Sequence, residues 1–389
     1  MRAFKISGIA ILAGVFTVLS ACSGCRIVVP DDESLVVVAY NLENLFDGRA
    51  NGSEYDEFLP EAGWSERDVD RRLQALGSVL HEISPAPDVL VVSEIENKAL
   101  LGRLLTDHAV DVPLEYHAFV GGVDSATGVA VASRYPIVSV RALLALSGDV
   151  PPLRPIMEAR LRLPETDLVV FANHWKSKRG GAAATEPLRR ATARLLSSRM
   201  SEIAAGEPDL PMIVAGDLNE QPRENEYCGA AYPTALMDVT TMREWEEAFG
   251  RDGPDSDGNV PGEDGEVTDA TEVPQWFTAG YREDGHYLPI TREIDLLPQG
   301  PTYYGTPVLA SLWSAGDDPG SYWYYGRWER IDHILVNLAA LQGAAITFRE
   351  FRCVHPAEGT DGDGVPVSWQ EGGVSDHLPI MAVFDRRSP

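Results

Sequence analysis

Residues 213–220 read IVAGDLNE, and the rest of the chain is organised around this stretch. The apolar run 213–215 is typical of a strand buried on both faces. Because side chains two apart share one face of a strand, Asp217 and Asn219 can point together while Leu218 points into the core. Buried polar groups need partners, so this strand end indicates a ligand or metal site. The alternative is a simple turn, since Asp, Asn and Gly commonly end strands.

The composition limits the classes of protein to which the chain can belong. Of its 389 residues 44% are hydrophobic, which suffices for one large domain or two ordinary ones. The net charge of -27 repels polyanions at a distance. Tight nonspecific binding to nucleic acid therefore requires locally focused basic residues or divalent cations. The sequence has no evident internal repeat.

The first residues predict export. A basic start precedes an apolar segment, residues 9–19, that is too short to span a bilayer, and small residues then lead to Cys22. This ending resembles the lipobox of bacterial lipoproteins, which implies removal of residues 1–21, lipidation of Cys22 and, because Ser23 follows, an outer-membrane location. An ordinary secretory signal is the alternative. Residues 22–34 are expected to form a tether, and the mature protein to face the periplasm or cell exterior.

The four cysteines divide into two groups. With Cys22 lipidated, Cys25 lies in the tether, and Cys228 and Cys353 remain for the globular part. In an oxidising compartment these two are expected to form a disulfide that closes a long loop. No Cys/His cluster indicates zinc.

The apolar pattern predicts a sheet covered by helices. Residues 35–40 and 88–95 are continuous apolar strands, and the helix expected between them at 65–83 has apolar residues three and four apart and a capping-box-like start. Its charged face, which includes Arg72, is expected to be solvated. This strand, helix, strand order is typical of an α/β fold. Further strands are predicted at 128–133, 158–163, 168–173, 330–336 and 380–384, and a helix at 185–205.

Six predicted strands carry polar side chains at their ends. One such end is explained by a turn, but six favour a common site. These residues are Asn41, Glu94, His174, Asp217 with Asn219, Asp332, and Asp376 with His377.

The stretch 174–181, HWKSKRGG, is the most basic part of the chain. Three positive charges beside two glycines indicate phosphate binding, with a solvated loop as the alternative. Residues 252–272 hold eight acids and no Lys or Arg, so an acidic surface insertion is expected at about 250–275. The aromatic stretch 322–328 is expected either to stack bases or to belong to the core.

Together these motifs resemble the endonuclease/exonuclease/phosphatase superfamily, over roughly residues 35–385. The resemblance implies one domain, residues 35–389, folded as an α/β four-layer sandwich with two mixed sheets face to face, helices outside and the site at one end of the sheets. The motifs that carry it are Asn41, SEIEN with Glu94, NHWKSK with His174, GDLNE, RIDHIL with Asp332 and SDHLPI with His377.

The resemblance also implies divalent-metal-dependent phosphodiester hydrolysis. Glu94 is the first candidate ligand, with Asp376 and Asn41 completing or orienting the shell. A hard cation prefers such oxygen ligands, so Mg²⁺ is expected, with Mn²⁺ or Ca²⁺ as alternatives.

The remaining site residues are assigned to water and phosphate. By resemblance, Asp217 orients or deprotonates the attacking water and Asn219 holds a phosphate oxygen. His377 contacts the phosphate as acid/base or donor, Asp332 fixes its tautomer, and His174 is a second donor. Further candidate phosphate contacts are Lys176, Lys178, Arg134 and Arg154, of which the two arginines are equally candidates for structural ion pairs.

The substrate is left with alternatives. The sequences NLENLFD and NHWKSKRGG are similar to those of secreted bacterial nuclease-like members of the superfamily. This similarity favours a monomeric nuclease that acts on extracellular DNA or RNA. A phosphatase or phospholipid phosphodiesterase on the same fold is the alternative, since an acidic surface suits a small substrate and a membrane tether suits a lipid. A non-catalytic surface binding protein is the third hypothesis.

Overall fold

The computed structural model describes residues 33–387 except 52–53, 123–124, 147–152, 250–259, 262–266, 269–273, 275, 278–280 and 282–284. The expected signal segment, Cys22 and most of the expected acidic insertion lie outside these residues. Within the described part, no helix has the length and apolar character needed to cross a membrane.

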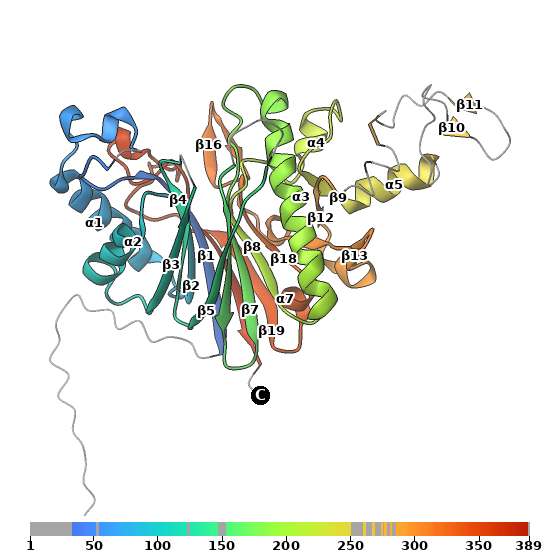
Figure 1. Ribbon diagram of the computed structural model, residues 1–389, viewed down its shortest axis with the longest axis horizontal. Coiled ribbons are helices and arrows are strands. Elements are labelled where there is room, and N and C mark those ends of the chain that lie inside the picture. Colours follow the sequence, from blue (N-terminus) through green and yellow to red (C-terminus); the bar gives the residue numbers. More distant parts are fainter. Residues whose placement is uncertain are drawn as a thin grey trace, which may run out of the picture.

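Two large mixed sheets form the centre of the molecule (Figure 1). The six-stranded sheet contains β1 (Ser34–Leu45), β2 (Val89–Ile95), β3 (Tyr116–Gly121), β4 (Gly128–Ser133), β19 (Ile346–Cys353) and β20 (Ile380–Arg386), in the spatial order β19-β20-β1-β2-β4-β3. The eight-stranded sheet contains β5 (Ile137–Leu143), β6 (Ile156–Arg162), β7 (Asp167–His174), β8 (Met212–Asp217), β9 (Leu236–Asp238), β12 (Leu288–Thr291), β15 (Leu309–Ser311) and β18 (Asp332–Val336), in the order β5-β6-β7-β8-β18-β15-β12-β9.

Helices and small hairpins surround the sheets. The helices are α1 (Glu66–Glu82), α2 (Lys98–Arg103), α3 (Ala182–Gly206), α4 (Glu224–Tyr227), α5 (Val239–Phe249) and α7 (Leu338–Gln342), with short 3₁₀ or π turns at Asp56–Phe58, Pro60–Ala62, Leu104–His108, Ile294–Gln299, Leu312–Ala315 and Trp369–Glu371. The hairpins pair β10 (Val260–Pro261) with β11 (Val267–Thr268), β13 (Thr302–Tyr303) with β14 (Thr306–Pro307), and β16 (Tyr322–Tyr324) with β17 (Arg327–Glu329).

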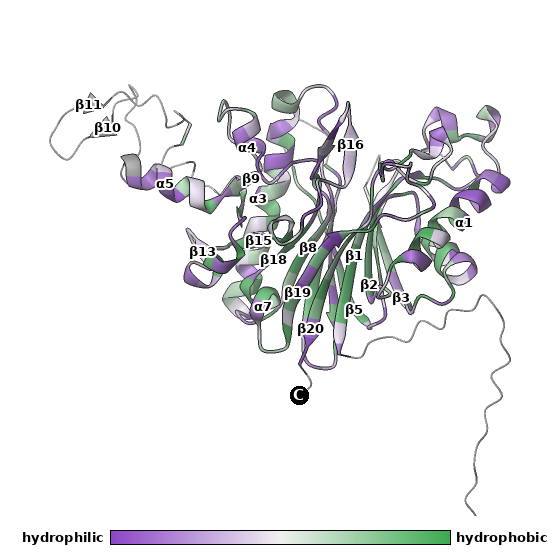
Figure 2. Ribbon diagram, turned by 180° about the vertical axis from the view of Figure 1, so that it is seen from behind, coloured by the Kyte–Doolittle hydropathy of each residue, from purple (hydrophilic) through white to green (hydrophobic). Residues whose placement is uncertain are grey.

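Three apolar clusters separate four layers, which confirms the predicted sandwich. Strand β1 shows why: Val37 and its alternate neighbours face the second sheet, whereas Val38 and its neighbours face α1 and α2. Strand β7 likewise turns Val170 inward and Phe171 toward α3. Strands buried on both faces are apolar throughout, and Figure 2 shows hydrophobic residues concentrated in them.

The helix predicted at 65–83 is α1, and its start is as expected. Ser65 and Asp68 form a capping box. The expectation for its charged face is wrong at Arg72, which is 1% exposed. Its guanidinium donates to the carbonyls of Leu42 and Glu43 and lies over the Trp369 ring. A long side chain can thus leave the polar face of a helix to satisfy buried carbonyls.

The order of the strands brings the polar strand ends to one edge. The carboxyl ends of β1, β2, β7 and β8 meet there, and β18 and β20 begin there because they run antiparallel to β8 and β1. At Gly216, with φ +120°, an added Cβ would lie 2.2 Å from the Asn173 carbonyl oxygen. The absence of a side chain therefore makes room for the backbone of the neighbouring strand β7, and this space is not available to a ligand.

Candidate active site

A row of titratable side chains crosses three neighbouring strands. The register places His174 on β7 beside Asp217 on β8, and Asp217 beside Asp332 on β18. All three are at least nine-tenths buried. His174 and Asp217 line a cavity of about 660 Å³, together with Glu94 and His377. Charged groups are gathered where desolvation is expensive, which is typical of a functional site.

His377 and Asp332 form a buried pair at this edge. The Nδ1 atom of His377 lies 2.7 Å from Oδ2 of Asp332, and Ser321 donates to the same oxygen at 2.6 Å. Burial alone lowers the pKa of His377, but the charges of Asp332 and Asp376 raise it well above its ordinary value. The Tyr322 ring stacks on the imidazole at 4.6 Å between centroids. The pair therefore holds an oriented imidazolium beside the cavity.

Asp217 is held by two donors beneath the cavity. The Asn219 backbone N–H donates to Oδ1 at 2.8 Å, and Asn41 Nδ2 donates to Oδ2 at 3.1 Å. Burial, and then the charge of Asp332, raise the pKa of Asp217 to about 7. Such a carboxylate can take a proton near neutral pH.

Arg154 approaches His174 from the cavity side. Its guanidinium donates to Nε2 of His174 at 2.7 Å and to the Trp175 carbonyl at 3.0 Å. Burial, and then the positive charge of Arg154, lower the pKa of His174 well below its ordinary value. His174 is therefore neutral, in contrast to His377.

Glu94 is the carboxylate best placed to hold a cation. Its ligand atoms group with those of His174 and Asp217 within 4.8 Å of one another. Asn41 Nδ2 donates to Oε1 at 3.2 Å and Asn44 N donates to Oε2 at 2.9 Å, which leaves a free lone pair on each oxygen. Arg154 already donates to Nε2 of His174, so the carboxylates of Glu94 and Asp217 remain as the oxygen ligands that a divalent cation prefers. Asp376 lines the same cavity, and burial raises its pKa.

Backbone strain gathers around Glu94. It has φ 60°, and Glu43, Asn44 and Asn219 have φ 50°, 55° and 52°. Residues other than glycine rarely adopt this left-handed region, and such strain concentrates at functional sites. Asn41 is placed as a donor to both carboxylates, and its own oxygen accepts the Glu43 N–H at 3.0 Å.

The four residues predicted to contact phosphate lie in different surroundings in the structure. Arg154 lines the cavity. Lys178 pairs with Glu224 at 2.6 Å and lines an adjoining cavity, while Lys176 contacts Ser177 at 3.3 Å. For Arg134 the structure shows the alternative, a structural ion pair: Arg134 pairs with Asp88 at 3.3 Å, at the opposite end of β2 from Glu94.

The expected disulfide is wrong. Cys228 and Cys353 are both free thiols. Cys228 follows α4, whereas Cys353 ends β19 with its thiol 3.4 Å from the Gly320 carbonyl oxygen. Burial raises the pKa of Cys353, so this thiol is structural rather than reactive.

Several residues at the cavity were not individually predicted. Arg179 lines it, and the basic stretch 174–181 contained the signal for this residue. Glu54, Asp56 and Glu57 form an acidic wall on the segment before α1, which no motif indicated. Tyr322 also lines the cavity, and the sequence indicated it only through the aromatic stretch 322–328.

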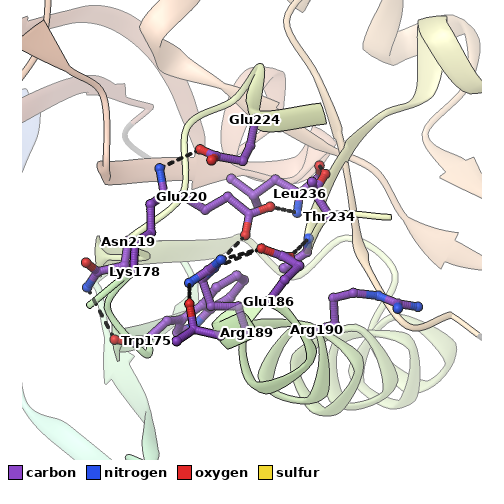
Figure 3. A network of polar contacts seen from close by, with 12 residues as sticks. Trp175, Lys178, Glu186, Arg189, Arg190, Asn219, Glu220, Glu224, Thr234 and Leu236 are labelled. Carbon is purple, nitrogen blue, oxygen red and sulfur yellow. Dashed lines mark hydrogen bonds and ion pairs between the residues drawn. The ribbon is translucent and has the colours of Figure 1, made fainter. Parts of the chain in front are cut away.

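A buried ionic cluster connects two of the segments that carry site residues (Figure 3). Arg189 of α3 donates to Glu186 and Glu220, and to the Lys176 carbonyl at 3.1 Å. It thereby joins the segment after His174 to the turn that carries Asn219. We call Glu186, Arg189 and Glu220 the sealed cluster.

The sequence matches one family model, over residues 36–231, described as the endonuclease/exonuclease/phosphatase family. The chain belongs to this family. No curated protein matches its sequence.

Solved structures of this family's fold are similar over nearly their whole length. A family protein of Bacteroides thetaiotaomicron is 16% identical, with a TM-score of 0.50, over 91% of this chain and 95% of that one. Truncated TDP2 of Caenorhabditis elegans is 13% identical, with a TM-score of 0.49, over 90% and 98%. A mannosyl-6-phosphatase of B. thetaiotaomicron is 15% identical, with a TM-score of 0.48, over 90% and 99%. At 16% identity, the likeness to the first of these structures supports the fold alone.

Proposed function

We propose that the chain is a divalent-metal-dependent phosphodiester hydrolase. The observation that carries the proposal is one cavity edge where Glu94 and Asp217 offer carboxylate oxygens within 4.8 Å of each other, beside the pair of His377 and Asp332. Phosphoryl chemistry needs an activated water and positive charge near the phosphorus oxygens, and this edge supplies both.

Glu94 would hold the cation, with Asp376 and Asp217 nearby and Asn41 orienting the carboxylates. The bound cation supplies Lewis acidity toward a phosphate oxygen. Asp217 accepts the proton of the attacking water, consistent with its raised pKa of about 7. Asn219 positions that water or a phosphate oxygen.

Positive charge surrounds the place of the phosphate. His377 stays protonated because Asp332 and Asp376 favour its charged form, and it donates to a phosphate oxygen or to the leaving oxygen. Arg154 and Arg179 line the cavity as further donors. His174, neutral and bonded to Arg154, orients that guanidinium.

We propose extracellular nucleic acid as the substrate, supported by the basic and aromatic wall formed by Arg179, Tyr322 and Tyr324. A second candidate is a small phosphoester. Glu54, Asp56 and Glu57 favour this candidate, because an acidic wall repels the further phosphates of a polymer.

The test is hydrolysis by the purified protein with Mg²⁺, Mn²⁺ or Ca²⁺. Plasmid and single-stranded DNA are compared with a panel of small phosphomonoesters and diesters, and Asp217→Asn is the matched inactive control. DNA cleavage that EDTA and Asp217→Asn both abolish supports the nuclease. Turnover of small esters alone supports the second candidate, and no turnover of any ester with any metal overturns the proposal.

We further propose export and lipid anchoring through Cys22, as a monomer. The support is the lipobox-like sequence at residues 19–22. Cys22→Ala should move the protein from the membrane fraction to the soluble fraction. Unchanged membrane association would count against the anchor.

A further inference from the structure

We call the sheet edge that carries Glu94, His174, Asp217, Asp332 and His377 the catalytic edge. A second cavity lies on the opposite side of the β16–β17 hairpin from it. It has a volume of about 410 Å³. Tyr322, Tyr324 and Glu329 project from one face of the hairpin toward the catalytic side, where they line the adjoining cavity. Trp328 projects from the other face and lines the second cavity. The hairpin therefore separates two binding surfaces.

The charge of this cavity is opposite to that of the chain. Of the residues that the structure describes, Arg223, Arg292 and Arg330 line it and no Asp or Glu does, although the chain has a net charge of -27. Glu226 pairs with Arg223 and Arg292, and Asp238 with Arg292, from outside the lining. The three arginines exceed these two acids by one charge. The lining therefore attracts an anion.

Arg330 is the arginine best able to bind a ligand. Its Nε and Nη2 donate to the carbonyls of Pro319 and Asp318 at 3.2 and 2.8 Å, which fixes the plane of the guanidinium. Its charge lies over the Trp313 ring, 5.2 Å from the centroid. Among the described residues, no carboxylate forms an ion pair with Arg330. A fixed guanidinium without an acidic partner can donate its remaining N–H groups to an anion.

The rest of the lining contributes the surfaces of aromatic rings. Tyr227, Trp313 and Trp328 contribute aromatic side chains. Ser311 also lines the cavity, but its hydroxyl oxygen is buried and not accessible to a ligand. Flat apolar surface beside cationic donors suits a ligand with a ring and an acidic group.

We propose that this cavity binds a small organic anion that carries an aromatic ring, of the chemical class of a nucleoside monophosphate. The anionic group binds Arg330, with Arg292 and Arg223 beside it, and the ring packs on Trp328 and Tyr227. The site lies outside the catalytic edge, so binding here requires no cation and no hydrolysis.

The test is calorimetric titration of the full chain with adenosine monophosphate, adenosine and inorganic phosphate, in EDTA at low salt. We expect saturable binding of the monophosphate, tighter than that of adenosine or phosphate alone. Arg330→Gln should weaken it by about tenfold or more, the effect of one charge-assisted hydrogen bond. Arg327→Gln removes an equal charge from the same hairpin and should leave the affinity unchanged, as should His377→Ala at the catalytic edge.

Three results would overturn the proposal: no saturable binding, binding that Arg330→Gln leaves intact, or binding that His377→Ala abolishes. Thermal melting checks that each variant folds. Should Arg330→Gln unfold because it loses the Pro319 and Asp318 contacts, Trp328→Ala carries the test, since its indole is only partly buried and it removes the ring surface alone. Equal affinity for phosphate and the monophosphate would eliminate the ring from the proposed ligand.

Discussion

Two buried ionic groups, the sealed cluster and the catalytic edge, differ in how completely their polar atoms are hydrogen-bonded. In the sealed cluster the Arg189 nitrogens donate to Glu186, Glu220, Thr185 and backbone carbonyls, and the second oxygens of the two carboxylates accept the N–H groups of Ala235 and Leu236. No cavity described above is lined by it. At the catalytic edge Asp332 Oδ1 has no hydrogen-bond partner in the described part of the chain, and Asp217 and His377 face a cavity.

This difference separates structural charge from functional charge. Both groups are almost completely buried and both shift pKa values strongly, so neither burial nor pKa distinguishes them. The two groups are distinguished by whether their polar atoms are fully hydrogen-bonded and whether they face a cavity. A reacting group must keep an atom free to contact the substrate. The catalytic edge should therefore govern rate, and the sealed cluster should govern stability.

The largest effect is expected from His377→Ala. Removing the imidazolium takes away a charged donor from the reaction, so the rate should fall by about 10²- to 10⁴-fold. Stability should also fall, because Asp332 is left buried without its positive partner. Steady-state kinetics with the ester that the parent protein hydrolyses and a urea unfolding curve measure both quantities. A large loss of stability with unchanged rate would reverse the roles assigned to the two groups.

A loss of stability without the loss of a reacting group is expected from Arg189→Met. It leaves Glu186 and Glu220 buried without their cation, which should lower the free energy of unfolding by about 3–5 kcal/mol. Arg190→Met is the matched control on the next position of α3, where the guanidinium is partly exposed and lies over Tyr281. Equal destabilisation by the two substitutions would contradict a special role for the sealed cluster.

The sequence predicted the catalytic edge better than the sealed cluster. GDLNE, RIDHIL and SDHLPI place polar groups at the ends of apolar strands, which is a local signal. Arg189 lies within a helix where solvent exposure is the ordinary expectation for arginine, and its partner Glu220 is 31 positions away. Arg72 was misjudged for the same reason. Contacts that depend on how helices dock on a sheet have no signature in local spacing.

A third prediction concerns pH and uses Glu220→Gln. Burial, and then the charge of Glu186, raise the pKa of Glu220 well above 4.5. The folded state therefore binds this proton more strongly than the unfolded state, and the stability it confers is present below pH ~4.5 and is lost as pH rises through the folded pKa. The free energy of unfolding of Glu220→Gln relative to the parent should thus rise with pH.

Glu207→Gln is the control of opposite sign. Its pairing with Arg160 lowers the pKa of Glu207, so the parent gains stability above the unfolded pKa and loses it as pH falls. Urea unfolding at a series of pH values measures both variants. A pH-independent difference for Glu220→Gln would contradict a raised pKa in the sealed cluster.

The smallest effect is expected where the sequence treated two arginines alike. Arg134→Ala removes a partly exposed partner of Asp88, whose other oxygen accepts the Val36 N–H at 2.9 Å, so stability should fall by only about 1 kcal/mol. The hydrolysis rate should stay at the parent value, because Arg134 lies at the far end of β2. Arg154→Ala, at the cavity, should lower the rate while leaving stability nearly unchanged. Equal losses of rate in the two variants would mean that distance from the cavity does not decide which arginine serves the phosphate.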